Sequence, residues 1–205
     1  MWVELDSSEA ECTKRAAEVV RRGGVAFYPT DTIYGLGCDP FNERAVERIF
    51  DIKKRPAEKG VLLLISGIEW FERLSAEVSL AGRELAQRFW PGPLTLIVKP
   101  RPDVPPWLLG REGKLGMRWP APPFLRSWLS ELEGPLVSTS ANLSGEPVPS
   151  TIEEMRQLFQ DKVDLFIEAD LEAGPASTVV DVTVEPARIV RAGALAEEIG
   201  KVLRI

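Results

Sequence analysis

Histidine is absent from all 205 residues of this chain. Without an imidazole, the chain has no Ser-His-Asp or Cys-His nucleophile, no histidine general base and no zinc site that needs a histidine ligand. Any chemistry must therefore depend on positioning, fixed charge and backbone dipoles.

Cysteine and long apolar runs are also scarce. The two cysteines, Cys12 and Cys38, could form one disulfide, but the sequence favours two reduced thiols in small apolar positions. No apolar run approaches the ~20 residues of a bilayer span, and the first residues, MWVELDSSEAECTK, lack the basic and apolar regions of a signal peptide. These features predict a cytoplasmic protein with no membrane contact.

Excess positive charge is missing as well. The formal net charge is −6 and the pI is about 5.0, which argues against the broad basic surface of a dedicated nucleic-acid binder. A local basic patch remains compatible with this balance. The length predicts one domain over residues 1–205.

Helical and strand-like patterns alternate along the chain. Helices are expected at 7–24, 42–54, 75–89, 122–132 and 150–159, with a short last helix. Strands are expected at 25–28, 61–65, 94–98, 114–119, 135–139, 163–169, 177–183 and 187–193. Ser150 to Glu153 fits a capping box. This order predicts an α/β fold around a mixed sheet, with polar loops at strand ends forming a ligand cleft.

The stretch GGVAFYPTDTIYGLGCDP is the first candidate for a binding loop. Pro40 stands where a dinucleotide fingerprint needs its third glycine, and no Gly-Lys-Ser/Thr phosphate loop occurs elsewhere. Gly35 and Gly37 fit a turn with positive φ. Thr30, Asp31 and Thr32 follow the apolar run, and hydroxyls beside an amide-rich turn fit a small polar ligand.

Two further stretches combine charges and hydroxyls. KKRPAEK places Lys53, Lys54, Arg55 and Lys59 at a helix end, where they either complement the helix dipole or project into a cleft to bind a triphosphate. STSANLSG, residues 138–145, is typical of a turn but also fits an anion-binding concavity. Arg118, Ser177 and Arg191 lie near strand ends, where each alone is typical of a solvated surface.

Seven motifs follow one another along the chain: YPTDTIYGLGCDP, KKRPAEKG, RFWPGPLTLIV, MRWPAPPF, STSANLSGEPVPST, STVVDV and RAG. In this order they resemble the YrdC family of threonylcarbamoyl-adenylate synthases in its short form. The resemblance extends from about residue 10 to about residue 195. The resemblance implies one twisted mixed sheet with helices packed on it and a deep electropositive cleft. It implies synthesis of threonylcarbamoyl-AMP from L-threonine, bicarbonate or CO2 and ATP, with release of pyrophosphate. A transferase complex would then modify adenosine 37 of tRNA.

The resemblance also implies roles for eleven residues. Lys53, Arg55, Ser140 and Asn142 match the catalytic ATP site, with Lys59, Lys114, Ser138 and Arg191 as further nucleotide contacts. Thr30, Arg118 and Ser177 match the threonine site. Mg2+ would arrive with ATP, and no metal site of protein side chains is expected. Lys114 replaces a small hydroxyl residue of many relatives and Pro122 replaces a histidine, which affects the expected shape of the threonine pocket.

The implied reaction agrees with the missing histidine, because a carbamate is already an anion and its attack on a phosphate depends mainly on alignment and charge neutralisation. Two other hypotheses remain at this point. One is a module of the same fold that binds double-stranded RNA during ribosome maturation. The other is a paralogue with weak or different activity.

Overall fold

The computed structural model describes residues 2–4, 9–56, 59–169 and 174–204. In this part of the chain ten strands form one mixed sheet in the order β1-β8-β2-β3-β7-β4-β6-β5-β9-β10. The strands are β1 (Trp2–Glu4), β2 (Ala26–Tyr28), β3 (Gly35–Gly37), β4 (Leu62–Leu64), β5 (Leu94–Val98), β6 (Leu115–Arg118), β7 (Leu136–Ser140), β8 (Leu165–Glu168), β9 (Thr178–Asp181) and β10 (Arg188–Arg191). The predicted α/β class with a mixed sheet is confirmed.

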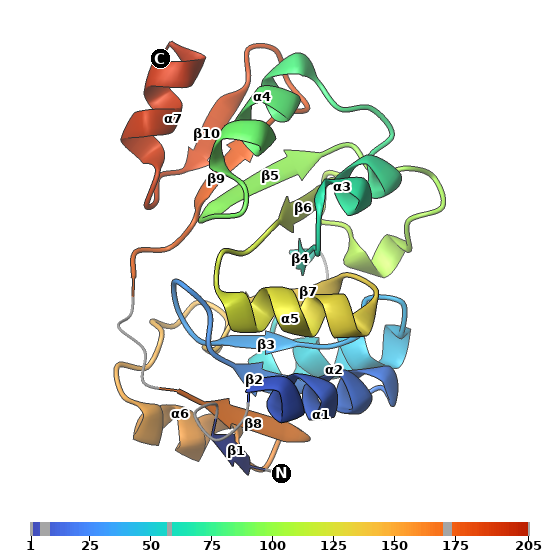
Figure 1. Cartoon of the computed structure of the whole chain (residues 1–205), viewed down its shortest axis with the longest axis vertical. Coiled ribbons are helices and arrows are strands. Elements are labelled where there is room, and N and C mark those ends of the chain that lie inside the picture. Colours follow the sequence, from blue (N-terminus) through green and yellow to red (C-terminus); the bar gives the residue numbers. More distant parts are fainter. Residues whose placement is uncertain (1, 5–8, 57–58, 170–173, 205) are drawn as a thin grey trace.

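Helices pack on both faces of this sheet (Figure 1). They are α1 (Glu9–Arg21), α2 (Glu43–Lys53), α3 (Ile68–Leu74), α4 (Leu80–Phe89), the short η2 (Pro106–Leu108), α5 (Pro123–Leu132), α6 (Ile152–Phe159) and α7 (Ala196–Leu203). None of the helices in the described ranges is long and apolar enough to cross a membrane.

Local sequence signals explain several helix ends. The Asn42 side chain accepts a hydrogen bond from the Ala45 amide and starts α2, and Lys54 ends α2 in the left-handed region at φ 50°. Pro122 and Pro123 begin α5, as expected from the tolerance of a first helical turn for proline. The capping box of α6 is formed by Thr151 and Glu154, one residue later than predicted.

The predicted helix over 75–89 is wrong in its first part. Ser75 ends α3, where its hydroxyl donates to the Phe71 carbonyl, and it forms a β-bridge with Pro100. The next helix begins only after Ser79, whose side chain accepts from the Gly82 amide. The short helix α3 and strand β1 were not predicted.

The two faces of the sheet differ in how completely they are covered. On one face, residues such as Leu63, Leu96 and Met117 join the main core under α2, α3, α4, α6 and α7. On the other face, α1 and α5 pack together over β2, β7 and β8 around Tyr28 and Trp128. Figure 1 shows these two helices in front of the lower half of the sheet. The strands beyond them, β6, β5 and β9, keep part of this face open.

Both cysteines are free and buried, as favoured from the sequence. Burial raises the pKa of the Cys12 thiol to about 11. Burial also raises the pKa of Cys38. Both thiols are therefore protonated at neutral pH and serve as small apolar groups.

Candidate active site

Two adjoining cavities, of about 250 and 420 Å³, occupy the open part of the sheet. They share Arg55, Leu62, Thr95 and Val179 in their walls. Strand alternation explains this surface, because Thr95 lies between Leu94 and Leu96, which both point into the opposite core. The cavities therefore lie on the sheet face that carries α1 and α5, and Leu125 of α5 lines the smaller one.

Basic side chains outnumber acidic ones around both cavities. Among the described lining residues, the basic ones are Arg55, Lys59, Arg111, Lys114, Arg118, Arg188 and Arg191, and the acidic ones are Asp31, Glu112 and Asp181. A chain with a formal net charge of −6 thus places seven cations and three carboxylates among the described residues that line these two cavities. Such an arrangement favours an anionic ligand there.

Thr30 closes the turn between β2 and β3. Its hydroxyl accepts from the backbone amides of Thr32 and Ile33, at 3.1 and 3.2 Å, and donates to the Ile33 carbonyl at 2.6 Å. Thr30 is 8% exposed and lines the smaller cavity. The hydroxyl therefore fixes the backbone that presents Asp31, in addition to the ligand contact predicted for it.

Arg118 reaches the same cavity from the end of β6. Its Nε donates to the Gly92 carbonyl at 3.1 Å and its Nη2 forms an ion pair with Asp31. Burial lowers the pKa of this guanidinium, while the Asp31 carboxylate opposes that shift. Arg118 is consequently a charged group at low exposure, held in one orientation by two acceptors.

Ser177 and Arg191 form a second polar corner. Arg191 Nη2 donates to both the carbonyl and the hydroxyl of Ser177, each at 3.0 Å. The Ser177 hydroxyl also lies 3.0 Å from that of Thr95. The sequence assigned these two residues to different substrates, but they are direct neighbours.

Lys53 and Asn142 lie outside the described lining of both cavities, next to Ser140 of the smaller one. Lys53 is 1% exposed, and its ammonium donates to the carbonyl of Ser140, to the carbonyl of Asn142 at 2.7 Å and to the Asn142 side-chain oxygen at 3.2 Å. Burial, with Arg55 and Lys59 nearby, lowers the pKa of Lys53 to about 8. Lys53 thus connects the end of α2 to the 140–142 loop. The Lys53 carbonyl also accepts from the Ser144 amide at 2.8 Å.

Arg55 and Lys59 continue from the end of α2 into the cleft. Arg55 Nη2 donates to the Gly60 carbonyl at 2.9 Å, and its buried Nε has no hydrogen-bond partner among the described residues. Lys59 Nζ donates to the Ser144 hydroxyl at 3.1 Å. Because Arg55 lines both cavities, it can contact a ligand that extends from one into the other.

The larger cavity contains a short charge network. Lys114 Nζ lies 2.7 Å from Glu112 and 2.9 Å from Asp181. The hydrogen bonds to these two carboxylates raise the pKa of Lys114. The amine that replaces a family hydroxyl is therefore paired within the protein.

Gly35 and Gly37 have a packing role. They form strand β3, and neither has a positive φ, so the expected turn is a correction. A Cβ on Gly37 would lie 2.8 Å from the Tyr28 ring and 2.6 Å from the Val137 carbonyl. The glycines leave room for Tyr28, whose hydroxyl donates to Ser138 Oγ at 2.7 Å.

Seven of the eleven sequence-predicted residues line the smaller cavity: Thr30, Arg55, Arg118, Ser138, Ser140, Ser177 and Arg191. Lys59 and Lys114 line the larger one, while Lys53 and Asn142 do not belong to the described lining of either. The predicted set omitted Asp31 and Thr95. A polar residue between Leu94 and Leu96 was a usable signal for Thr95, since alternation places it opposite the core.

The acidic residues that the structure describes do not assemble into a metal site. In the described part of the chain no group of three or more His, Cys, Asp or Glu side chains could hold a metal ion. Glu112 and Asp181 at the larger cavity pair with Lys114.

Comparison with known proteins places the chain in a family. The family profile described as "Sua5_yciO_yrdC: Telomere recombination" matches residues 18–193. The chain belongs to this Sua5/YciO/YrdC family.

Two curated relatives are threonylcarbamoyl-AMP synthases. A threonylcarbamoyl-AMP synthase of Pyrococcus abyssi is 37% identical over 190 residues, covering 92% of this chain and 56% of that protein. The chain thus spans little more than half of that relative. A threonylcarbamoyl-AMP synthase of Pseudomonas aeruginosa UCBPP-PA14 is 37% identical over 163 residues, covering 80% of this chain and 86% of the relative.

Solved structures share the fold. The crystal structure of P. abyssi Sua5 complexed with L-threonine superimposes with a TM-score of 0.92 at 35% identity, over 98% of this chain and 60% of that one. E. coli YciO superimposes with a TM-score of 0.84 at 32% identity, over 95% of both chains.

Proposed function

We propose that this chain is a threonylcarbamoyl-AMP synthase, which joins L-threonine, bicarbonate or CO2 and ATP and releases pyrophosphate. The observation that carries the proposal is the convergence of seven predicted substrate residues on one cavity. These residues come from separate parts of the chain, between Thr30 and Arg191. Their positions in the sequence alone do not explain why they line the same cavity. The names of the curated relatives support the same activity.

Threonine is assigned to the smaller cavity, between Thr30, Arg118 and Ser177. The triphosphate is assigned to Arg55, the hydroxyls of Ser138 and Ser140, and Arg191. The nucleoside then extends into the larger cavity, past Lys59 and Lys114. Arg55 supports this arrangement because it lies in the wall shared by the two cavities.

The proposed reaction has two steps. The neutral amine of threonine adds to CO2, which forms a C–N bond, releases one proton and leaves a carbamate anion. A carbamate oxygen then attacks the α-phosphorus of ATP, forming a P–O bond. The bond between the α-phosphorus and the oxygen bridging to the β-phosphate breaks, and pyrophosphate leaves with that electron pair.

The residues of the cleft contribute charge and alignment to this reaction. Arg55 and Arg191 neutralise phosphate oxygens, and Ser138 and Ser140 offer hydroxyl donors. Lys53 and Asn142 act by holding the Ser140 loop in place. Mg2+ would be bound mainly by phosphate oxygens and water, because Asp31 is the one carboxylate among the described residues that line the smaller cavity. The ion would add further charge neutralisation.

The product would serve a transferase complex that modifies adenosine 37 of tRNA. Weak direct binding of RNA is a second use of the basic cleft, favoured by the seven cations around it. The formal net charge of −6 weighs against RNA binding as the main role.

Pyrophosphate release is the test. We expect release from ATP to require both threonine and bicarbonate, because the carbamate is the nucleophile. Equal release with ATP alone would contradict the synthase and favour a paralogue with another activity. RNA affinity that falls steeply with salt and does not respond to ATP would favour the RNA-binding role.

A further inference from the structure

Asp31 is the acidic member of the described lining of the smaller cavity, and it is not among the eleven residues to which the resemblance assigned a substrate. Among the described lining residues of this cavity it is the only carboxylate, beside Arg55, Arg118 and Arg191. Its Oδ1 pairs with Arg118 Nη2, and 18% of its side-chain surface stays accessible, against 5% for Arg118. The carboxylate is therefore oriented by the arginine while part of it still faces the cavity.

The backbone holds Asp31 in this place. The Thr30 hydroxyl accepts from the two amides that follow Asp31 and donates to the Ile33 carbonyl. Arg118 is fixed in turn by the bond from its Nε to the Gly92 carbonyl. Both members of the ion pair are consequently set before a ligand arrives, which lowers the entropy lost on binding.

An adjacent carboxylate and guanidinium suit one kind of ligand. A simple anion next to Arg118 is repelled by Asp31, and a simple cation next to Asp31 is repelled by Arg118. An α-amino acid carries an ammonium and a carboxylate on neighbouring atoms, so it can meet both charges with opposite ones. The Asp31 carboxylate disfavours a phosphate beside it, whereas the cations Arg55 and Arg191 favour one beside them.

We propose that Asp31 and Arg118 form a binding site for a zwitterionic α-amino acid, in which Asp31 accepts hydrogen bonds from the ammonium group and selects ligands that carry one. This proposal rests on the proposed function, which names threonine as the ligand. It adds a specificity residue for the amine, whereas the predicted threonine contacts were Thr30, Arg118 and Ser177.

Binding measured by calorimetry without ATP tests this assignment independently of catalysis. The ligands are L-threonine and 3-hydroxybutyrate of the matching configuration, which lacks only the amino group. The native protein should bind threonine roughly 10- to 100-fold more tightly than 3-hydroxybutyrate, as expected for loss of a hydrogen bond to a charged group. Asp31→Asn should lose most of this preference, because threonine affinity falls while 3-hydroxybutyrate binds as before or better.

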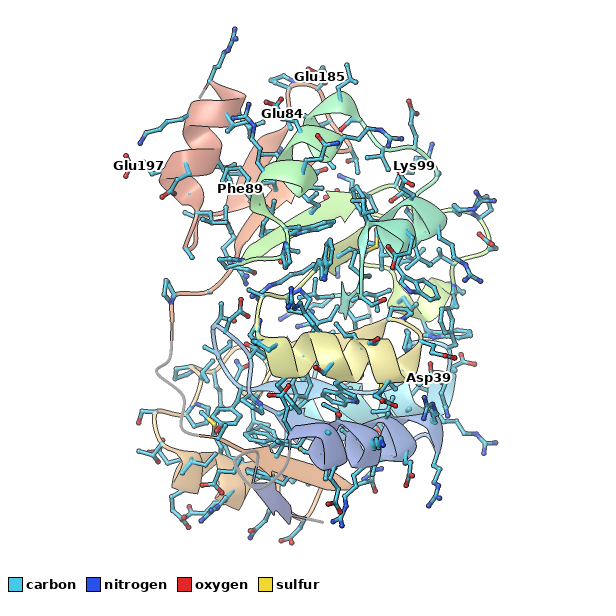
Figure 2. The ribbon with its side chains drawn as sticks, viewed as in Figure 1. Asp39, Glu84, Phe89, Lys99, Glu185 and Glu197 are labelled. Atoms are coloured by element: carbon cyan, nitrogen blue, oxygen red, sulfur yellow. The ribbon has the colours of Figure 1, made fainter. Side chains whose placement is uncertain are left out.

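Asp39→Asn is the matched control. Asp39 is a partly exposed aspartate that follows β3 and lies outside the described lining of both cavities. It is labelled at the right-hand edge of the molecule in Figure 2. Its Oδ1 accepts from the Phe41 amide at 2.9 Å, a bond that an asparagine oxygen can also accept. The control should keep the native preference for threonine.

The outcomes separate the two proposals. Native protein that binds both ligands equally overturns the zwitterion site, even if thermal melting shows that Asp31→Asn does not fold. An equal loss of affinity for both ligands in a folded Asp31→Asn variant also overturns it, because Asp31 would then act only by orienting Arg118. Pyrophosphate release that requires threonine would leave the synthase proposal standing in either case, whereas its absence together with no threonine binding would contradict both proposals.

Discussion

The buried hydrogen bond between Tyr28 and Ser138 permits a quantitative test of how the cavity wall is held. Tyr28 is 0% exposed and Ser138 is 6% exposed, and the tyrosine hydroxyl donates to Ser138 Oγ at 2.7 Å. Tyr28→Phe keeps the ring, which packs edge-on against Trp128 at a centroid distance of 4.9 Å. The variant therefore removes one hydrogen bond and creates almost no cavity.

The two single variants should differ in cost. Tyr28→Phe should lower the free energy of unfolding by about 0.5–1.5 kcal/mol, the net value of one hydrogen bond, because Ser138 can turn toward the cavity for another partner. Ser138→Ala should cost about 1–3 kcal/mol, because it leaves the tyrosine hydroxyl buried without an acceptor. The double variant should cost less than the sum of the single variants, since no orphaned hydroxyl remains.

Urea unfolding of the native protein, the two single variants and the double variant measures this double-mutant cycle. In thermal unfolding of the same proteins, each kcal/mol should correspond to a melting-temperature change of roughly 2–4 °C for a chain of this size. Additive costs, within about 0.5 kcal/mol, would refute the reasoning because they would show that the two hydroxyls are not coupled. Ser138→Ala milder than Tyr28→Phe would also refute it, since the buried tyrosine would then have another partner.

Three further predictions concern the charged residues. Lys53→Met should lower pyrophosphate release roughly 10- to 100-fold through loss of the Ser140 loop anchor, while the exposed cap variant Lys54→Ala should stay near the native rate in steady-state assays; equal losses would contradict the anchoring role. The free energy of unfolding of the native protein, relative to that of Lys53→Met, should rise between pH 8 and 10.5, because Lys53, with its pKa lowered to about 8, loses its proton in the folded state before it does in the unfolded state. Urea unfolding at both ends of this pH range checks the sign. A fall in the relative free energy of unfolding would mean that the carbonyl acceptors keep Lys53 charged. Arg118→Lys should raise the KM for threonine about 10- to 100-fold and the KM for ATP far less. It should also lower the melting temperature, because Arg118 is 4% exposed and binds Asp31 and Gly92. A larger effect on the KM for ATP would show that the assignment of Arg118 to threonine is wrong.

Local signals in the sequence were sufficient for much of the fold. Asn42 and the proline pair at 122 and 123 start helices where expected, because capping and proline geometry act within one turn. The 75–89 region was predicted as one helix because its break depends on the bridge between Ser75 and Pro100, a contact between distant parts of the chain. The Gly35 to Gly37 strand was taken for a turn because the need for glycine comes from the Tyr28 ring on the neighbouring strand.

For the candidate site, the sequence by itself determined which kinds of catalysis are excluded and which residues are candidates. The missing histidines excluded imidazole catalysis, and the ordered motifs indicated the family and eleven candidate residues. Only the tertiary structure decided which of these residues line the cavities and which side chains they contact. It buries Lys53 under the Ser140 loop, joins Arg191 to Ser177 and pairs Asp31 with Arg118. Residue type and spacing specify which charges are present, but partners such as Asp31 and Arg118 are 87 residues apart in the sequence. Their contact depends on the arrangement of strands in the sheet, which places the turn after β2 beside the end of β6, on the part of the sheet face that α1 and α5 leave open.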